Sequence, residues 1–142
     1  MQYAVDRDYP ALYLEDLLAL RDFDALDDDT MVDYVTRALV DPTSRRPSIE
    51  TLLHGFLPAK HIDHVHADAI CALTNHPQGE KAVREALGEE FAYVDWIRPG
   101  FELSKLVGGL GDYAGVVLAH HGLVVWDEDS DRCYQKTLDA VA

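Results

Sequence analysis

The chain has 142 residues, 48% of them hydrophobic and 27% charged, and its 26 acidic against 12 basic side chains give a formal net charge of −14. This length is typical of one compact domain, so we expect residues 1–142 to form a single domain. The excess of carboxylates argues against nucleic acid or an anionic membrane as a partner, and no apolar run approaches the ~20 residues that would span a bilayer.

Turn signals divide the chain into short segments that alternate between helical and strand periodicity, which predicts an α/β fold. In the first part we expect a helical or loosely ordered segment at residues 13–20, a helix capped by Thr30, and a helix that begins near Ser48. The spacing in the last of these predicts one apolar stripe, formed by Ile49, Leu52, Leu53 and Phe56. Glu50 and His54 stand four residues apart and therefore share a face beside the stripe.

The rest of the chain continues the alternation of helices and strands. We expect strands at residues 62–66, 91–96, 115–119 and 123–126, and helices at residues 67–73, 81–87 and 101–107, followed by a last helix capped by Ser130. Its inward-facing residues are expected to be Cys133, Tyr134, Thr137, Leu138 and Val141. Two cysteines in helical segments and no signal-like start predict a reduced, cytoplasmic protein.

Two histidines are separated by one residue in the segment Ile62-Asp63-His64-Val65-His66. Alternate side chains of a strand project from the same side, so His64 and His66 would be aimed at one point. Such a pair is typical of a metal site but also occurs as ordinary strand histidines with local partners. His54, His61 and His76 are interpreted as supporting or surface residues.

A second histidine pair, His120-His121, ends a buried strand just before Gly122. Because successive side chains alternate, only one of the two can point inward. We expect Gly122 to permit the turn that presents the preceding side chain, which favours His121. Three converging imidazoles are the ligands of a catalytic zinc site, which leaves one position open for water or substrate.

The segments Pro47-Ser48-Ile49-Glu50, His64-Val65-His66 and His120-His121-Gly122, in that order, resemble the class II aldolase/adducin family in its metal-dependent sugar-phosphate aldolase branch. The stretch 46–126 is most similar to the aldolase domains of rhamnulose-phosphate aldolase/dehydrogenase fusion proteins. The resemblance implies a three-layer α/β/α fold around a mixed, largely antiparallel sheet. It also implies a zinc ion, or another divalent metal, bound by His64, His66 and His121, with Glu50 as the acid/base residue.

In this family the metal chelates a ketose 1-phosphate, and retro-aldol cleavage gives dihydroxyacetone phosphate and an aldehyde. The resemblance therefore implies a lyase of carbohydrate metabolism with a small sugar phosphate as substrate. It also implies a homo-oligomer, with a cyclic tetramer as the expected form. No Schiff-base lysine is needed for this chemistry.

One part of the family pattern is absent from the sequence. Family members hold the substrate phosphate with glycine-rich segments before the Pro-Ser-x-Glu helix, whereas the first glycine here is Gly55. We therefore expect the fold to lack the N-terminal strands and Met1 to be an internal or truncated start. The glycine-rich stretch at residues 107–111 is interpreted as a connection between a helix and a strand.

Several other functions are compatible with parts of the same pattern. The segment His64-Val65-His66-Ala67-Asp68 contains the HxHxD pattern of metallo-β-lactamase-type hydrolases, but Ala69 stands where that motif adds a histidine. An adducin-like association module shares the aldolase fold but loses the metal ligands. A dehydratase or an epimerase on the same scaffold is a further alternative.

Overall fold

The computed structural model describes residues 9–142, so the expectation about Met1 lies outside the described residues. The chain divides into two compact units. Unit 1 contains the chain up to Phe56 together with Arg98–Gly108, and unit 2 contains Leu57–Ile97 together with Gly109–Ala142. The expectation of a single domain stays a prediction.

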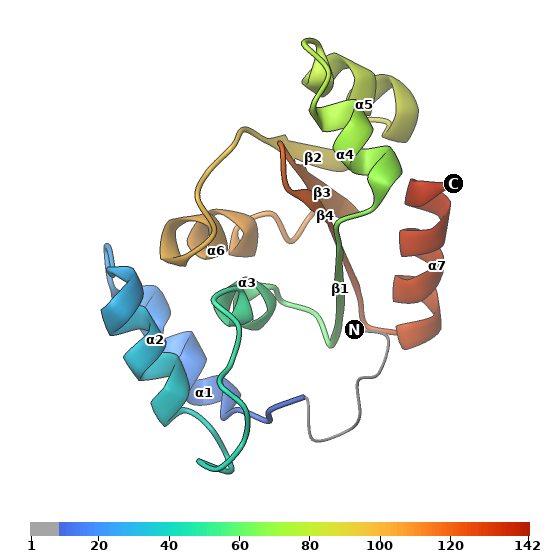
Figure 1. Ribbon diagram of the computed structural model, residues 1–142. Helices are drawn as coiled ribbons and strands as arrows, with labels where there is room; N and C mark the ends of the chain where they lie inside the picture. Colours follow the sequence, from blue (N-terminus) through green and yellow to red (C-terminus); the bar gives the residue numbers. More distant parts are fainter. Residues whose placement is uncertain (1–8) are drawn as a thin grey trace. The chain divides into compact units, whose positions relative to one another are not determined.

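Unit 1 is helical (Figure 1). Its elements are α1 (Leu14–Leu18), the 3-10 helix η2 (Ala19–Asp22), α2 (Asp28–Arg37), α3 (Thr51–Phe56) and α6 (Phe101–Gly108). Their core consists of Leu17, Leu20, Met31, Val35, Ala38, Leu52, Phe56 and Phe101. A Cβ atom at Gly108 would lie 2.8 Å from the Cβ atom of Phe56, so the glycine allows α3 and α6 to approach closely.

Two expectations about the helices of unit 1 are wrong. Helix α2 is capped by Asp27, whose carboxylate accepts hydrogen bonds from the backbone N–H and the hydroxyl of Thr30. These bonds lower the pKa of Asp27, and a carboxylate at this end also suits the helix dipole. Helix α3 begins only at Thr51, and Ile49 lies before it with 37% of its surface exposed, so the apolar stripe starts at Leu52.

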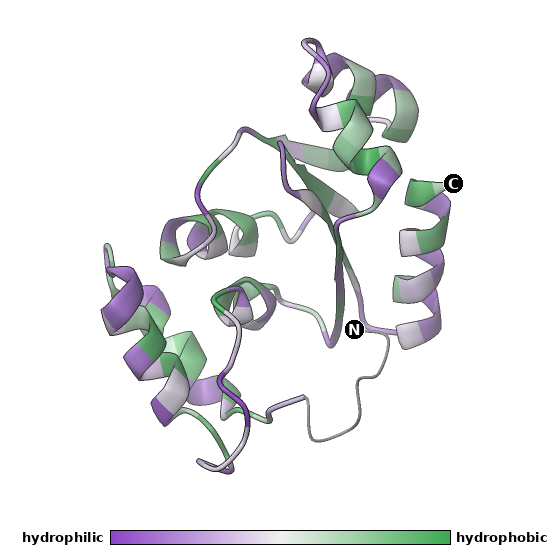
Figure 2. Cartoon of the chain, in the orientation of Figure 1, coloured by the Kyte–Doolittle hydropathy of each residue, from purple (hydrophilic) through white to green (hydrophobic). Residues whose placement is uncertain are grey.

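Unit 2 contains a four-stranded sheet made of β1 (His61–Val65), β2 (Phe91–Val94), β3 (Gly115–Leu118) and β4 (Gly122–Asp127). The strand order is β1-β4-β3-β2. Strand β4 pairs antiparallel with β1 and β3, and β2 pairs parallel with β3. The expected α/β fold with a mixed, largely antiparallel sheet is therefore confirmed. Strands β3 and β4 are buried, and Figure 2 shows them mainly in the hydrophobic colour.

Three helices complete unit 2: α4 (Asp68–Thr74), α5 (Gly79–Leu87) and α7 (Ser130–Val141). They share a core with the sheet, formed by Ile70, Val83, Val117, Leu123, Val125 and Cys133. Only part of the expected inner face of α7 is correct, because Tyr134 is 60% and Leu138 41% exposed. Among residues 9–142, none of the helices has the length and apolar character needed to cross a membrane.

An ion-pair network joins the end of β4 to α7. Asp127 accepts a hydrogen bond from Arg132 and forms an ion pair with Lys136, and these contacts hold the pKa of its carboxyl well below the ordinary value. Since the folded pKa is depressed, the unfolded chain binds more protons below about pH 4, and the stabilisation is present above that pH and lost as the pH falls.

Replacement of this carboxylate tests the network. We expect Asp127→Asn to unfold at lower denaturant concentration than the unchanged protein at pH 7, and the difference to shrink as the pH is lowered below about 4. Urea unfolding followed by circular dichroism at several pH values measures this difference. A difference that stays constant across the acid range would mean that the charge of Asp127 does not contribute.

Candidate metal centre

The pairing of β1 with β4 places three histidines at one end of the sheet. His64 lies on β1, His66 follows β1 directly, and His121 lies in the turn between β3 and β4. Val65 pairs with Leu123 in the antiparallel register. The end of β1 therefore lies beside the start of β4, where His121 stands, although 55 residues separate His66 from His121 in the sequence.

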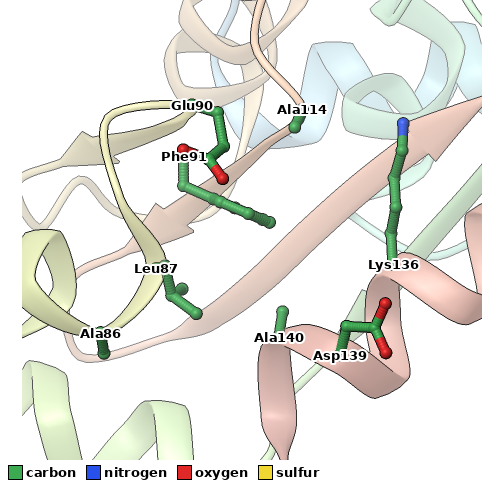
Figure 3. A pocket seen from close by; sticks show the side chains of 8 residues that line it. All are labelled: Ala86, Leu87, Glu90, Phe91, Ala114, Lys136, Asp139 and Ala140. Atoms are coloured by element: carbon green, nitrogen blue, oxygen red, sulfur yellow. The ribbon is translucent and has the colours of Figure 1, made fainter.

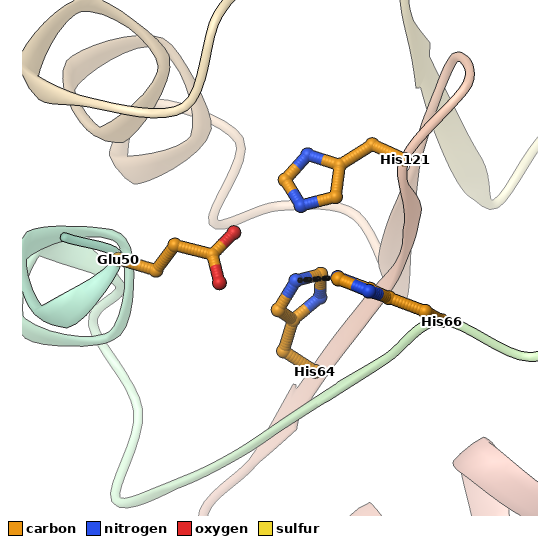
Figure 4. A group of neighbouring side chains, drawn as sticks. All are labelled: Glu50, His64, His66 and His121. Carbon is orange, nitrogen blue, oxygen red and sulfur yellow. Dashed lines mark hydrogen bonds between the residues drawn. The ribbon is translucent and has the colours of Figure 1, made fainter. Parts of the chain in front are cut away.

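The three imidazoles converge (Figure 4). Ring centroids lie 4.8 Å apart for His64 and His66, 5.0 Å for His64 and His121, and 4.9 Å for His66 and His121. One nitrogen from each ring lies within 4.8 Å of one nitrogen of each of the others. This spacing allows a single cation to be reached by all three rings after small movements of the side chains.

Hydrogen bonds define which nitrogens of the cluster are available. The Nδ1 atom of His64 lies 2.9 Å from the carbonyl oxygen of Leu123. A carbonyl only accepts, so Nδ1 carries a proton, and in the neutral ring Nε2 then keeps a lone pair. The Nε2 atom of His66 lies 3.0 Å from that Nε2 atom and donates to it. A divalent cation could replace this proton, and the bond from His64 to a backbone carbonyl is the outer contact that metal-bound histidines usually make.

The residues fit a borderline-soft divalent metal. Three neutral imidazoles are the protein ligands of several catalytic zinc sites. Cobalt, nickel and copper also bind imidazole, so the donor set alone does not select zinc.

The two histidines of the second pair have different environments. His120 adopts a positive φ of 56° and its Nδ1 atom donates to the Oδ1 atom of Asn75 over 2.6 Å. It lines a polar pocket of about 590 Å³ with Asn75 and His76, whereas His121 points to His64 and His66. Of this pair, the structure places His121 beside His64 and His66 and bonds His120 to Asn75 instead, and the role of His121 as a metal ligand stays a prediction.

The reason for glycine at position 122 differs from the one expected. The positive φ belongs to His120, not to Gly122. A Cβ atom at Gly122 would lie 2.5 Å from the carbonyl oxygen of Val65 and 2.9 Å from the Cδ2 atom of His66. The glycine is therefore needed because the backbone of β1 and the ring of His66 come so close.

The close approach at Gly122 gives a prediction. We expect Gly122→Ala to push β1 away from β4 and to lower the free energy of unfolding by roughly 1–3 kcal/mol, the usual cost of overpacking. Urea unfolding measures this change. A Gly122→Ala protein as stable as the unchanged chain would refute the steric explanation.

Glu50, the expected acid/base residue, belongs to unit 1. It is half-buried just before α3, and its backbone N–H donates to the hydroxyl of Ser48 over 3.2 Å. With Ser48 and His54 it lines a pocket of about 340 Å³ within unit 1. Its catalytic role stays a prediction.

A pocket in unit 2, shown in Figure 3, does not suit a phosphate. It has a volume of about 320 Å³ and is lined by Glu90, Lys136, Asp139 and apolar residues. The ammonium group of Lys136 already donates to the carbonyl of Trp126 and pairs with Asp127. The carboxylates of Glu90 and Asp139 therefore share the pocket with a single lysine that is already engaged.

Residues 109–114 connect α6 to β3, in agreement with the interpretation of the glycine-rich stretch.

Two residues that bond to the turn carrying His121 have no signal in the sequence. The Sγ atom of Cys71 donates to the carbonyl of His121 over 3.7 Å, and Asn75 accepts from His120. Both lie on or next to α4, more than 40 residues before the turn. Only the position of α4 against β4 brings them there.

Known proteins show the same fold and sequence pattern. Residues 18–141 match the family described as "Class II Aldolase and Adducin N-terminal domain". The "Uncharacterized oxidoreductase YuxG" of Bacillus subtilis (strain 168) is 42% identical over 137 residues, which are 94% of this chain and 20% of that protein. The chain thus spans about a fifth of the length of this curated relative.

Solved structures agree with this match. The "N-terminal Class II Aldolase domain of a conserved protein from Thermoplasma acidophilum" has a TM-score of 0.89 and 34% identity over 95% of this chain and 64% of that one. YgbL, "a putative aldolase/epimerase/decarboxylase from Klebsiella pneumoniae", has a TM-score of 0.56 and 24% identity, covers 72% of this chain and 57% of that one, and supports the fold alone. The chain belongs to the class II aldolase and adducin family.

Proposed function

We propose that the chain acts as a metal-dependent aldolase that cleaves a ketose 1-phosphate into dihydroxyacetone phosphate and an aldehyde. The observation that carries this proposal is the convergence of His64, His66 and His121 in a member of the class II aldolase and adducin family. The resemblance to rhamnulose-phosphate aldolase/dehydrogenase fusion proteins supports a 6-deoxy sugar as substrate. The Bacillus subtilis relative is named an oxidoreductase, and a fusion of an aldolase domain with a dehydrogenase would account for that name.

The three histidines would hold zinc or another divalent metal. The Nδ1–H of His64 is engaged by the carbonyl of Leu123, which directs the lone pair of Nε2 toward the other two rings. When bound, the metal would supply a Lewis acid that stabilises the negative charge developing on the substrate oxygens.

Glu50 would move the proton of the reaction. In the retro-aldol direction a base takes the proton of the C4 hydroxyl, the C3–C4 bond breaks, and C3 is protonated as the ketone fragment leaves. A carboxylate can accept and return a proton in this way. The support for Glu50 is its place in the Pro-Ser-x-Glu pattern, which precedes α3.

Two rival functions have less support. An adducin-like association module would not need the three converging imidazoles. A metallohydrolase of the HxHxD type would use Asp68, which is exposed at the start of α4 and, among the described residues, is outside the group of close ligand atoms.

Metal analysis and an aldolase assay on the same preparation test the proposal. We expect the purified protein to contain a divalent metal and to release dihydroxyacetone phosphate from rhamnulose 1-phosphate or fuculose 1-phosphate. Metal without cleavage of either sugar would refute the aldolase but keep the metal centre. Neither metal nor cleavage would favour the association module. We further propose a cytoplasmic homo-oligomer, with a tetramer as the expected form.

A further inference from the structure

Several hydrogen bonds hold the turn that carries His121. The backbone N–H of His121 donates to the carbonyl of Leu118 over 3.1 Å, and its own carbonyl accepts from the Sγ atom of Cys71 over 3.7 Å. The ring Nδ1 atom of the preceding residue, His120, donates a hydrogen bond to the Oδ1 atom of Asn75 over 2.6 Å. The peptide groups on both sides of the His121 Cα atom are therefore bonded, which limits the directions in which its imidazole can point.

Both side chains that reach the turn come from the same segment, Cys71 from α4 and Asn75 from its C-cap position. Cys71 and Asn75 are four residues apart and thus lie on the same side of the helix, and the backbone N–H of Asn75 closes the last turn by donating to the carbonyl of Cys71 over 3.0 Å. The helix itself is anchored in the core of unit 2 by Ile70, which is fully buried.

His120 has a backbone conformation that needs such support. Its φ of 56° lies in the left-handed region, which few residues other than glycine adopt, although histidine is among the more tolerant ones. Conformations of this kind persist where surrounding contacts hold them. The bond from His120 to Asn75 is such a contact, and the conformation of His120 sets the direction of the next residue.

The same helix is also linked to another histidine of the cluster. Helix α4 begins at Asp68, with Ala67 as its N-cap, so only one residue separates His66 from the helix. A single rigid element thus follows His66 in the chain and holds the turn of His121 through its side chains.

From these contacts we propose that Asn75 and Cys71 are positioning residues of the metal centre, which act by fixing the His120-His121 turn. Neither side chain would touch the metal. This inference rests on the proposed metal site but not on the aldolase reaction. It predicts that loss of the Asn75 acceptor weakens metal binding, because His121 would then sample orientations that do not converge with His64 and His66.

Zinc affinity, measured by competition with a chromophoric chelator, tests the inference. We expect Asn75→Leu to weaken zinc binding by roughly 10–100-fold, the range typical of losing a group that orients a metal ligand. Asn75→Asp keeps an acceptor oxygen for His120 and should bind nearly as tightly as the unchanged protein. The matched control is Gln135→Leu, which removes an exposed amide that bonds to Asp139 on α7 and should not change zinc affinity.

A His120→Gly protein distinguishes a positioning role of Asn75 from a general effect of Asn75 on folding. Glycine adopts the left-handed region freely and has no ring, so in a His120→Gly protein the change Asn75→Leu should cause no further loss of zinc affinity. If the full loss persists there, Asn75 does not act through His120 and the inference is wrong. A lower unfolding temperature of metal-free Asn75→Leu with unchanged zinc affinity would likewise overturn it.

The outcome for the unchanged protein distinguishes this inference from the proposed function. If the unchanged protein binds no zinc in the competition experiment, the proposed metal centre fails, and the inference fails with it. If the unchanged protein binds zinc and Asn75→Leu binds it equally well, only the inference fails. A loss of affinity in Asn75→Leu that disappears in the His120→Gly background supports the inference even if no aldolase activity is found.

Discussion

His64→Ala and His121→Ala are each expected to leave the purified protein without bound metal. Among the described residues of unit 2, three imidazoles form the group of close ligands, so removal of one leaves two ligands, too few for a stable catalytic zinc site. The loss of affinity should exceed the roughly 10–100-fold effect of removing an outer contact. Metal content is measured by elemental analysis after dialysis, and affinity by chelator competition.

The control for these changes is another histidine of the same unit. His76 is exposed, and its Nδ1 atom accepts a hydrogen bond from the backbone N–H of Gln78. His76→Ala should therefore keep the full metal content. Equal metal content in His64→Ala and the unchanged protein would place the metal elsewhere and end the interpretation of the cluster as its ligands.

Glu50→Gln is expected to keep the metal and to lose turnover. The amide has nearly the same shape as the carboxylate but cannot accept the substrate proton, and general acid–base catalysis typically contributes 10²–10⁴-fold to a rate. We therefore expect kcat to fall by about 10²–10⁴-fold in the retro-aldol assay. This prediction rests on the proposed reaction.

A glutamate of unit 1 provides the comparison for Glu50. Glu102 is exposed in the first turn of α6, and Glu102→Gln should retain both metal and turnover. Glu50→Gln protein with normal kcat would assign the proton transfer to another group. If Glu50→Gln loses metal as well, its side chain would have a role in binding instead of in proton transfer.

Local sequence patterns predicted most elements because hydrophobic spacing reports directly on burial. The strand around His64 and the buried strands near Val117 and Val124 were placed to within two residues. Errors occurred where competing groups decide the boundary. Asp27 caps α2 in place of Thr30, and Asp129 caps α7 in place of Ser130, because a carboxylate one to three residues earlier accepts the free N–H groups.

The convergence of the histidines was predictable only in part. Strand alternation aims His64 and His66 at one point, and the turn at Gly122 favours His121 over His120, but strand pairing cannot be read from spacing, so these patterns alone do not show that the two segments meet. The left-handed conformation of His120 and the two side chains of α4 that reach the turn had no signal in the sequence. Such contacts depend on packing between segments that are distant along the chain.

The division into units also has a consequence for how the chain is made. The backbone passes between the units three times, at residues 56–57, 97–98 and 108–109, so no single cut separates them. Helix α3 cannot pack against α6 until α6 has been synthesised, and β1 cannot pair with β4 until the chain has been synthesised as far as Asp127. During synthesis from the N-terminus, unit 1 therefore stays incomplete until α6 has been made and unit 2 until β4 has been made, and nascent chains that stall before β4 should be more exposed to chaperones and proteases than chains that have passed it.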